Sequence, residues 1–209
     1  MKRIFIYILI GLTYSCKSMA QNMRDLVSTM PDTILPLLTK NDRLDFIDYL
    51  DSNMKAEVSN KMGGKSEMTT ISDDYTHIKM SPNSEVAFKL LPYGNAPIVC
   101  MIHTYSANAS ESLIKFYTTA WTELNTNDFI QIPSANKFLV LSDSLTLTDC
   151  ENILNKMDVI LTKIEFIKNT NNLTLTLTTP LYMSEENRKA TAPHIRESIT
   201  MKWNGRKFE

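Results

Sequence analysis

The hydrophobic pattern begins with a short apolar run, Ile4 to Leu12, directly after the cations Lys2 and Arg3. A charged start followed by an apolar core of this length is typical of a secretory signal peptide. The run is too short to cross a bilayer as a permanent helix. The start of the chain therefore indicates export from the cytoplasm.

Two small residues, Ser18 and Ala20, mark the expected end of this segment. They hold the two positions that a signal peptidase reads before its cleavage site. We therefore expect residues 1–20 to be a signal peptide and the mature chain, from Gln21, to be periplasmic or otherwise exported.

Cys16 leaves an alternative interpretation of the same segment open. A bacterial lipoprotein signal ends in a cysteine that is acylated and becomes the new N-terminus. Such a signal favours a Leu-like residue three positions earlier, where this chain has Thr13, although Ser15 fits the pattern. Soluble export is the main expectation, with a lipid anchor at Cys16 or an uncleaved N-terminal anchor as alternatives.

Apolar residues at helical spacing predict a short helix over residues 22–30, which Pro31 ends. A second helix is expected from a cap at Asn41 to about Met54. Its buried side would carry Phe46, Ile47, Leu50 and Met54, and its other side Asp42, Asp45, Asp48 and Asp51.

From Glu67 onward the pattern changes to a period of two, which is typical of strands with one buried face. The connections are short enough to allow only antiparallel neighbours, so the strands form a meander. Residues 112–119 continue the meander as a strand or, as an alternative, form a helix that runs into Trp121 and Leu124. The other candidate strands are 67–72, 75–80, 85–91 and 97–106.

Residues 125–145 show no clear hydrophobic period. After them, a capping box from Thr148 to Glu151 predicts the start of a helix. The helix that follows would bury Cys150, Ile153, Leu154 and Met157. Strands are expected at 158–168 and 172–178, then a polar loop at 184–197 and a tight turn at Asn204-Gly205.

This order of elements predicts an α+β fold. An antiparallel β-meander sheet carries the N-terminal helices, and a second helix-plus-strands unit packs on it. We expect residues 21–209 to form a single domain, and two similar halves with a break near 125–145 are an alternative.

Composition excludes several classes of partner. The chain has 209 residues, a formal net charge of −1 and 22% charged residues, which indicates no nucleic-acid-binding surface. After the N-terminal segment no second long apolar run follows, so no membrane span is expected. With five glycines, the chain shows no linker that would divide it.

The mature chain contains two cysteines, Cys100 and Cys150. Outside the cytoplasm they could form a disulfide, and the alternative is a pair of buried free thiols. We expect both side chains to be buried in either case.

Three segments of the sequence, MPDTILPLLTKNDRLDFIDYL (30–50), KLLPYGNAPIVCMIHTY (89–105) and MKWNGRKFE (201–209), carry a resemblance. They resemble a domain of unknown function found in uncharacterised exported proteins from Bacteroides-type gut bacteria. The resemblance covers nearly the whole chain and implies a location in the outer compartments of a Gram-negative cell. It implies no substrate and no functional residue.

The three histidines, His77, His103 and His194, lie in different segments. Cys100 and His103 could together ligate a metal or form a nucleophile and its base, but residues three apart in a strand face opposite sides. We therefore assign both to structural roles. No HExxH, GxSxG, P-loop or CxxC motif is present.

Carboxylates give the remaining candidate chemistry. Asp73 and Asp74, near His77, are better explained by a turn than by a metal or acid–base site, because Asp side chains bond the nearby backbone. Asp32-Thr33-Ile34 and Asp143-Ser144-Leu145 resemble a loose O-glycosylation pattern of such bacteria. The carboxylates that could serve a hydrolase are Glu165, Glu185 and Glu186.

We therefore assign no catalytic, cofactor-binding or metal-ligating residue and expect no cofactor and no tightly bound transition metal. The helix aspartates should form a solvated face, since calcium needs convergent oxygens. The leading hypothesis is a non-enzymatic, exported binding or accessory module for an envelope protein, a peptide or a glycan. The alternative is a small carboxylate-dependent hydrolase of cell-wall or dietary polymer.

The first testable prediction concerns the N-terminus. Because the charged start, apolar core and small residues agree, the native protein should begin at Gln21. Mass spectrometry of protein isolated from its own cells measures this directly. A diacylglyceryl group on an N-terminal Cys16 would replace this prediction by the lipoprotein alternative.

Overall fold

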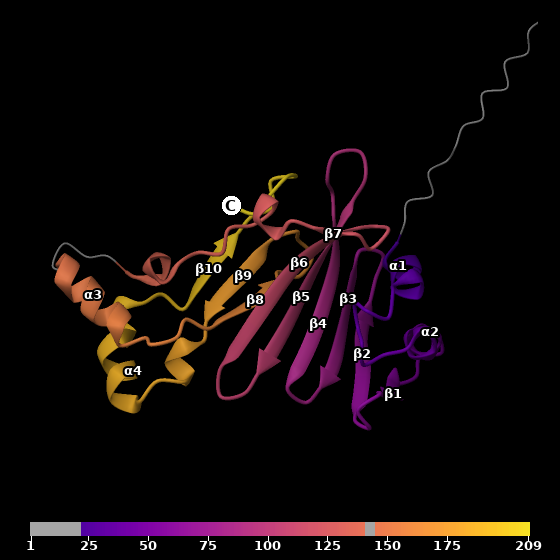
Figure 1. The fold of residues 1–209 in the computed structure, drawn as a ribbon, viewed down its shortest axis with the longest axis horizontal. Coiled ribbons are helices and arrows are strands. Elements are labelled where there is room, and N and C mark those ends of the chain that lie inside the picture. Colours follow the sequence, from indigo (N-terminus) through magenta and orange to yellow (C-terminus); the bar gives the residue numbers. More distant parts are fainter. Residues whose placement is uncertain (1–21, 141–144) are drawn as a thin grey trace, which may run out of the picture.

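The computed structural model of the protein describes residues 22–140 and 145–209 and has an α+β fold (Figure 1). A seven-stranded antiparallel sheet runs in chain order from β1 to β7, and a three-stranded antiparallel sheet has the order β10-β9-β8. The α+β class and the antiparallel meander predicted from the sequence are confirmed. The division into one domain or two halves stays a prediction.

The strands of the larger sheet each pair with their neighbours in sequence, because the turns between them are short. The register runs without interruption from Ile98↔Thr118 to Ser106↔Ser110 between the two longest strands. Alternate side chains of every strand therefore lie in rows across the two faces. The strands are β1 (Glu57–Ser59), β2 (Lys65–Ile71), β3 (Tyr75–Ser81), β4 (Ser84–Leu91), β5 (Ile98–Ser106), β6 (Ser110–Thr118) and β7 (Glu123–Leu124).

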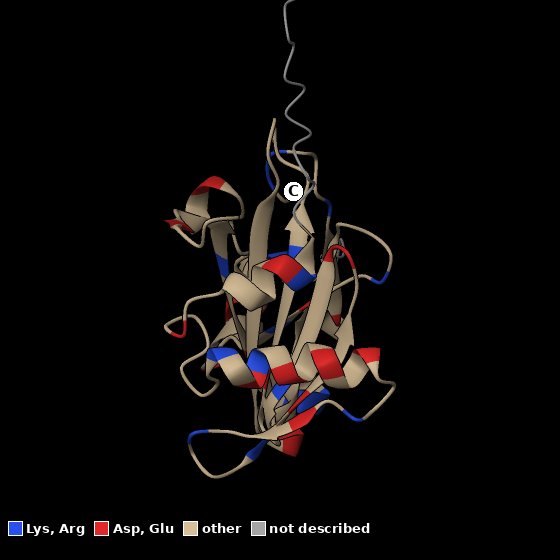
Figure 2. Ribbon diagram, turned by 90° about the vertical axis from the view of Figure 1, so that its right-hand side faces the viewer, with Lys and Arg blue, Asp and Glu red and all other residues tan. Residues whose placement is uncertain are grey.

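Helices α1 (Met23–Thr29) and α2 (Lys40–Asp51) cover one face of this sheet (Figure 1). Their apolar sides meet buried residues from β1 to β6 in one core, to which Phe46 and Phe88 contribute fully buried rings. The acidic positions of α2 recur along its length (Figure 2), and Asp45, Asp48 and Asp51 are exposed. The solvated face expected for this helix is confirmed at these three positions.

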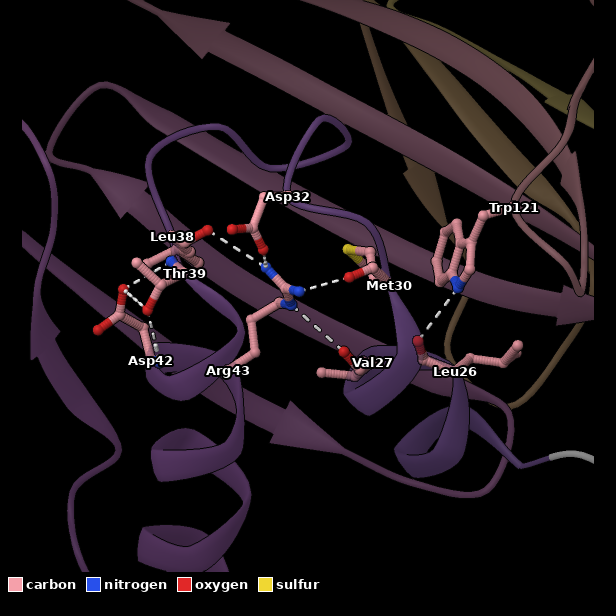
Figure 3. Close-up of polar contacts among 9 residues, drawn as sticks. All are labelled: Leu26, Val27, Met30, Asp32, Leu38, Thr39, Asp42, Arg43 and Trp121. Atoms are coloured by element: carbon pink, nitrogen blue, oxygen red, sulfur yellow. Dashed lines mark hydrogen bonds and ion pairs between the residues drawn. The ribbon is translucent and has the colours of Figure 1, made fainter.

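A buried guanidinium group joins the two helices to the segment between them (Figure 3). Arg43 is completely buried, and its Nη1 lies 2.9 Å from Asp32 Oδ1. Its nitrogen atoms also donate to three backbone carbonyls, those of Val27, Met30 and Leu38. The planar fork of arginine can serve several acceptors at once, so one side chain satisfies carbonyls that would otherwise be buried without partners.

The end of the meander is attached to α1 through a tryptophan (Figure 3). Trp121 is buried and its indole Nε1–H donates to the carbonyl of Leu26 at 3.2 Å. Its ring packs edge-on against Phe88 with centroids 5.7 Å apart. The backbone of Trp121 has φ of 64°, a conformation that costs energy in a bulky residue and that these contacts stabilise.

The three-stranded sheet covers part of the other face. Its strands are β8 (Thr162–Phe166), β9 (Leu173–Leu177) and β10 (Ser198–Met201). Leu173, Leu175 and Leu177 are buried against Cys100, Ile102, Ile114 and Phe116, which come from β5 and β6. The alternation of leucine and threonine in β9 is the signal that predicts this half-buried strand, and the strand is confirmed.

Two short helices, α3 (Leu147–Asn155) and α4 (Glu185–Thr191), lie at the end of the molecule opposite α1 and α2 (Figure 1). The second part of the chain also has the 3₁₀ turns Thr126–Asp128, Ala135–Phe138, Thr179–Leu181 and Ala192–His194.

Both predicted capping positions are wrong by two residues. The cap of α2 is Thr39, whose hydroxyl accepts from the N–H of Asp42 while the Asp42 carboxylate accepts from the N–H of Thr39, and it replaces Asn41. The cap of α3 is Thr146, in a reciprocal box with Asp149, in place of Thr148. In both boxes the third residue after the threonine is Asp, where Glu or Gln is the usual partner. The shorter Asp side chain still reaches the backbone N–H of the cap, so each helix is capped at this threonine.

Several predicted boundaries also differ. Helix α2 ends at Asp51, and Met54 is 55% exposed, because Asn53 has φ of 55° and interrupts the helix. The polar loop expected at 184–197 contains α4, which has a Ser184 cap and an i,i+4 pair in place of an apolar face. The strand expected at 158–168 is limited to β8, and the three-residue β1 was not predicted at all.

Residues 112–118 lie in strand β6 (Ser110–Thr118), so the helical alternative for residues 112–119 is wrong. Cys100 and Cys150 are free thiols, and no disulfide joins them. Cys100 is buried as expected, but Cys150 is only half-buried because its helix packs at the margin of the core.

The predicted signal peptide, with Cys16, and the Asp143-Ser144 pair lie outside the described residues. Among the helices that the structure does describe, none has the length and apolar character needed to cross a membrane. Asp32 binds Arg43, and the neighbouring Thr33 is exposed.

The second prediction concerns the buried arginine. Arg43→Met keeps the side-chain volume but leaves three carbonyls and Asp32 without their donor, so the free energy of unfolding should fall by about 3 kcal/mol. Arg24→Met is the matched control, because Arg24 pairs with Asp51 at the surface and should change stability by less than about 1 kcal/mol. Urea unfolding measures both, and equal effects would contradict the prediction.

Candidate functional site

The face of the larger sheet that carries the three-stranded sheet changes from apolar to polar along its width. Cross-strand pairs set the rows on this face: His77 is opposite Ala87, which is opposite Ile102, and Tyr75 is opposite Lys89. The apolar ends of the rows, on β5 and β6, lie under the second sheet. Tyr75, His77, Glu85, Ala87 and Lys89, on β3 and β4, form a polar strip beside it.

Strand β8 forms a wall along this strip, because it is the edge of the three-stranded sheet. Two of its backbone N–H groups face outward and bind side chains of β6. The N–H of Ile164 donates to Ser112 Oγ at 2.9 Å, and the N–H of Thr162 donates to Glu111 Oε2 at 2.6 Å. These bonds hold the edge of one sheet against the face of the other and satisfy donors that an edge would leave unpaired.

A first hollow of about 350 Å³ lies between the strip and this wall. All residues that line it come from strands β2 to β5 and β8. A chain of polar contacts crosses it from Thr69 Oγ1 to His77 Nδ1 (2.7 Å), from His77 Nε2 to Glu85 Oε2 (3.3 Å) and from Glu85 Oε1 to Lys163 Nζ (3.4 Å). Lys163 Nζ also lies 2.8 Å from Glu165 Oε1.

A second hollow of about 690 Å³ continues the first. Both are lined by Thr70, Tyr75 and Phe166, so they form one groove. Tyr75 and Phe166 meet edge to face across it with centroids 6.0 Å apart. The far side of the second hollow is the β8–β9 turn, residues 167–171.

A buried lysine forms the floor of the second hollow. Lys89 is only 6% exposed, and its Nζ lies 2.7 Å from Asp74 Oδ2. An ammonium group has three donors, and Asp74 takes one of them. Lys89 therefore places a positively charged donor beneath the polar groove.

The electrostatics of the groove follow from these pairs. Burial lowers the pKa of Lys163, but the hydrogen bond and charge of Glu165, with the charge of Glu85, outweigh burial and raise it. Burial raises the pKa of Asp74, and its hydrogen bond and ion pair with Lys89 reverse this and lower it. Burial, and then the charges of Glu85 and Glu165, raise the pKa of Tyr75.

Thr69, His77 and Glu85 stand in the order of a nucleophile, a base and an orienting carboxylate. Thr69 sits at a β-bulge, where the register of β2 shifts between Met68 and Thr70. Its hydroxyl also faces the carbonyl of His77 at 3.4 Å, so it serves to close the bulge. We interpret the three side chains as a polar cluster at the base of the first hollow, in which Thr69 and Glu85 fix the orientation of the His77 ring.

The structure separates the residues that the sequence grouped. Asp74 lies in the turn before β3, with Ser72 Oγ donating to it at 3.2 Å, as the turn interpretation predicts. It lines the second hollow, whereas His77 lines the first. Asp73 accepts the N–H of Met23 through its backbone carbonyl.

Cys100 and His103 lie on opposite faces of β5, as the strand parity predicts: Cys100 is opposite Phe116, and His103 is opposite Leu113. His103 stacks on Tyr105 with centroids 4.3 Å apart, and burial lowers its pKa. Of the carboxylates considered for a hydrolase, Glu165 lines the groove, while Glu185 is exposed in α4 and pairs with Lys189.

Among the described residues, no group of three or more His, Cys, Asp or Glu side chains could hold a metal ion. Of the residues that build the groove, Asp74, His77 and Glu165 were considered from the sequence but Tyr75, Glu85, Lys89 and Lys163 were not, although β4 carries a usable signal. In Glu85-Val86-Ala87-Phe88-Lys89, the apolar residues occupy one parity, and charged or small residues occupy the other. A buried central strand with a lysine at this parity indicates a polar site on its second face.

These features define an α+β domain with a polar groove between two antiparallel sheets. The profile of the family described as protein of unknown function DUF3256 matches residues 15–208, so the chain belongs to that family. This supports the resemblance to a domain of unknown function. Among curated proteins, no match is found.

A solved structure described as a domain of an uncharacterized protein from Porphyromonas gingivalis W83 is similar to this chain. The TM-score is 0.79 with 21% sequence identity, over 91% of this chain and 98% of the other. At this identity the similarity shows that the two share a fold.

The third prediction uses the tyrosine at the centre of the groove. Tyr75 should titrate above its ordinary value near 10, and the stability that this gives is present below that value and is lost as the pH rises through the folded-state pKa. Because burial is the larger cause, Phe166→Ala should lower this pKa more than Glu165→Gln does. NMR titration of ring-labelled tyrosine measures both, and the reverse order would show that charge outweighs burial at Tyr75.

Proposed function

We propose that the chain is an exported, non-enzymatic binding module and that its ligand, a glycan, occupies the groove between the two sheets. The observation that carries the proposal is the continuity of the two hollows over the polar strip, with Tyr75 and Phe166 common to both. The charged start and apolar core of residues 1–20 support export.

The charges of the groove suit an uncharged polar ligand. Three carboxylates, Asp74, Glu85 and Glu165, and three lysines, Lys89, Lys163 and Lys168, line the two hollows. A sugar hydroxyl can donate to a carboxylate and accept from an ammonium group at the same time. Lys163, held by two carboxylates, offers both kinds of partner in one place.

The aromatic pair supplies the apolar part of the site. Tyr75 is half-buried and stands at the point where the hollows join, with the Phe166 ring against it. Ligand sites commonly combine aromatic surface with a few polar groups that fix orientation. A pyranose ring has an apolar C–H face and a rim of hydroxyls, and this groove presents partners for both.

The hydrolase alternative rests on Glu85 and Glu165, since both line the first hollow. A glycosidase needs one carboxyl group that holds a proton and one that does not. Here a single ammonium group, Lys163 Nζ, lies 3.4 Å from Glu85 Oε1 and 2.8 Å from Glu165 Oε1, so the two carboxylates share one ion-pair environment and are not set in two different ones. This arrangement supports binding over acid catalysis.

The fourth prediction tests binding with cellohexaose, xylohexaose and chitohexaose by calorimetry. At least one should bind, and Glu165→Gln and Tyr75→Ala should each weaken it by about tenfold, near 1.4 kcal/mol. Tyr182→Ala is the matched control, because Tyr182 is 66% exposed outside the groove and should leave affinity unchanged.

Chromatography of the same mixtures separates binding from catalysis. The oligosaccharides should be recovered intact after prolonged incubation. Shortened products that disappear in Glu165→Gln would establish the hydrolase instead, and failure of all three sugars to bind would contradict a glycan as the ligand.

A further inference from the structure

The outer edge of β10 has a section without a strand partner. β10 is an edge strand, and its inner side pairs with β9. The N–H of Leu177 donates to the carbonyl of Glu197. This bond shows which alternate residues of this segment direct their backbone N–H and C=O groups toward β9. Ile199 and Met201 therefore direct their backbone groups toward β9, and Ser198 and Thr200 direct theirs outward.

The chain itself pairs with this edge on both sides of that section. Before it, Arg196 N–H donates to the carbonyl of Phe138 at 2.7 Å, within an antiparallel bridge between Leu139 and Ile195. After it, Lys202 and Glu209 exchange backbone hydrogen bonds of 2.7 and 3.0 Å. Within the described residues, the section from 197 to 201 has no partner on this side.

A hollow of about 470 Å³ lies at the same section. Its apolar lining includes Ile132, Ile199 and Met201, and its ends are marked by Arg196 and Glu209. The open edge and the hollow are independent observations that coincide. A strand placed on the edge would direct alternate side chains into the hollow.

We propose that this section of β10 binds an extended peptide segment of a partner protein as an added antiparallel strand. The flanking pairs close both ends, so the slot accepts a free segment of about five residues and excludes the edge of another folded sheet. The site lies on the edge opposite β8, so it does not depend on the groove or on a glycan ligand.

The neighbours of the slot define the peptide. Both flanking pairs are antiparallel, as the bridges Leu139↔Ile195 and Trp203↔Phe208 show, so the peptide would begin beside Glu209 and end beside Arg196. Positions opposite Met201 and Ile199 should be apolar, and those opposite Thr200 and Ser198 should be polar. Arg196 and Lys137 favour an acidic residue at the final position.

The fifth prediction uses the blocked peptide acetyl-valyl-threonyl-valyl-threonyl-aspartyl amide as its probe. At millimolar concentration it should shift the amide NMR signals of Ser198 and Thr200 and slow their hydrogen exchange. The amide of Ile199, already bonded to β9, should keep its exchange rate. The same peptide N-methylated at both threonines lacks the two donors for this edge and should have no effect.

Thr200→Pro removes one outward N–H. Proline is tolerated at this position because the missing N–H would lie on the free side of an edge strand. It should weaken binding of the peptide about fivefold, the factor that corresponds to the net contribution of one hydrogen bond, while Thr200→Val, which keeps the N–H, should bind as the native chain does. If the proline variant does not fold, the N-methylated peptide still tests the same bonds. Equal binding of both peptides, shifts confined to the groove at Tyr75, or no shift at Ser198 and Thr200 would overturn the proposal.

Discussion

The architecture depends on one constraint: the two layers that cover the larger sheet are offset, so most of its strands lie under only one of them. Helices α1 and α2 bury one face mainly at β1 to β5, and the three-stranded sheet buries the other at β5 and β6. Strand β5 lies under both layers and is apolar on both faces, as Cys100 and Met101 show. β3, and all of β4 except Leu91, lie outside the core under the smaller sheet, so their second face can be polar. The groove exists because the smaller sheet ends before the larger one does.

The sequence predicted the parts of the fold that local patterns determine. Period-two strands, the Leu–Thr alternation of β9 and the helix before Pro31 were all found near their predicted positions, because each is set by residues a few positions apart. Neighbouring signals of similar strength caused the errors: Thr146 and Thr148 both begin a plausible capping box. Helix α4 was missed because it has caps and an ion pair but little apolar periodicity.

The site could not be predicted in the same way, because its contacts join distant segments. Lys163 reaches Glu85 across the two sheets, and Glu111 receives the edge of β8. In each pair, the sequence around one residue does not indicate which distant residue it contacts. The sequence did contain one signal, the charged residues at alternate positions of β4. This signal becomes informative only when it is known which face of the larger sheet the second sheet leaves open.

The bond between the Trp121 indole and the carbonyl of Leu26 spans 95 residues of chain and has a consequence for the order of assembly. A polypeptide made or threaded through a membrane N-terminus first presents α1 long before β6 and the turn at Trp121 exist. Helix α1 can form early, but its seat on the sheet is completed only after more than half of the chain has arrived. The first helix therefore acquires its final contact only when the turn after β6 has been made, and until then part of its apolar side has no partner from the sheet.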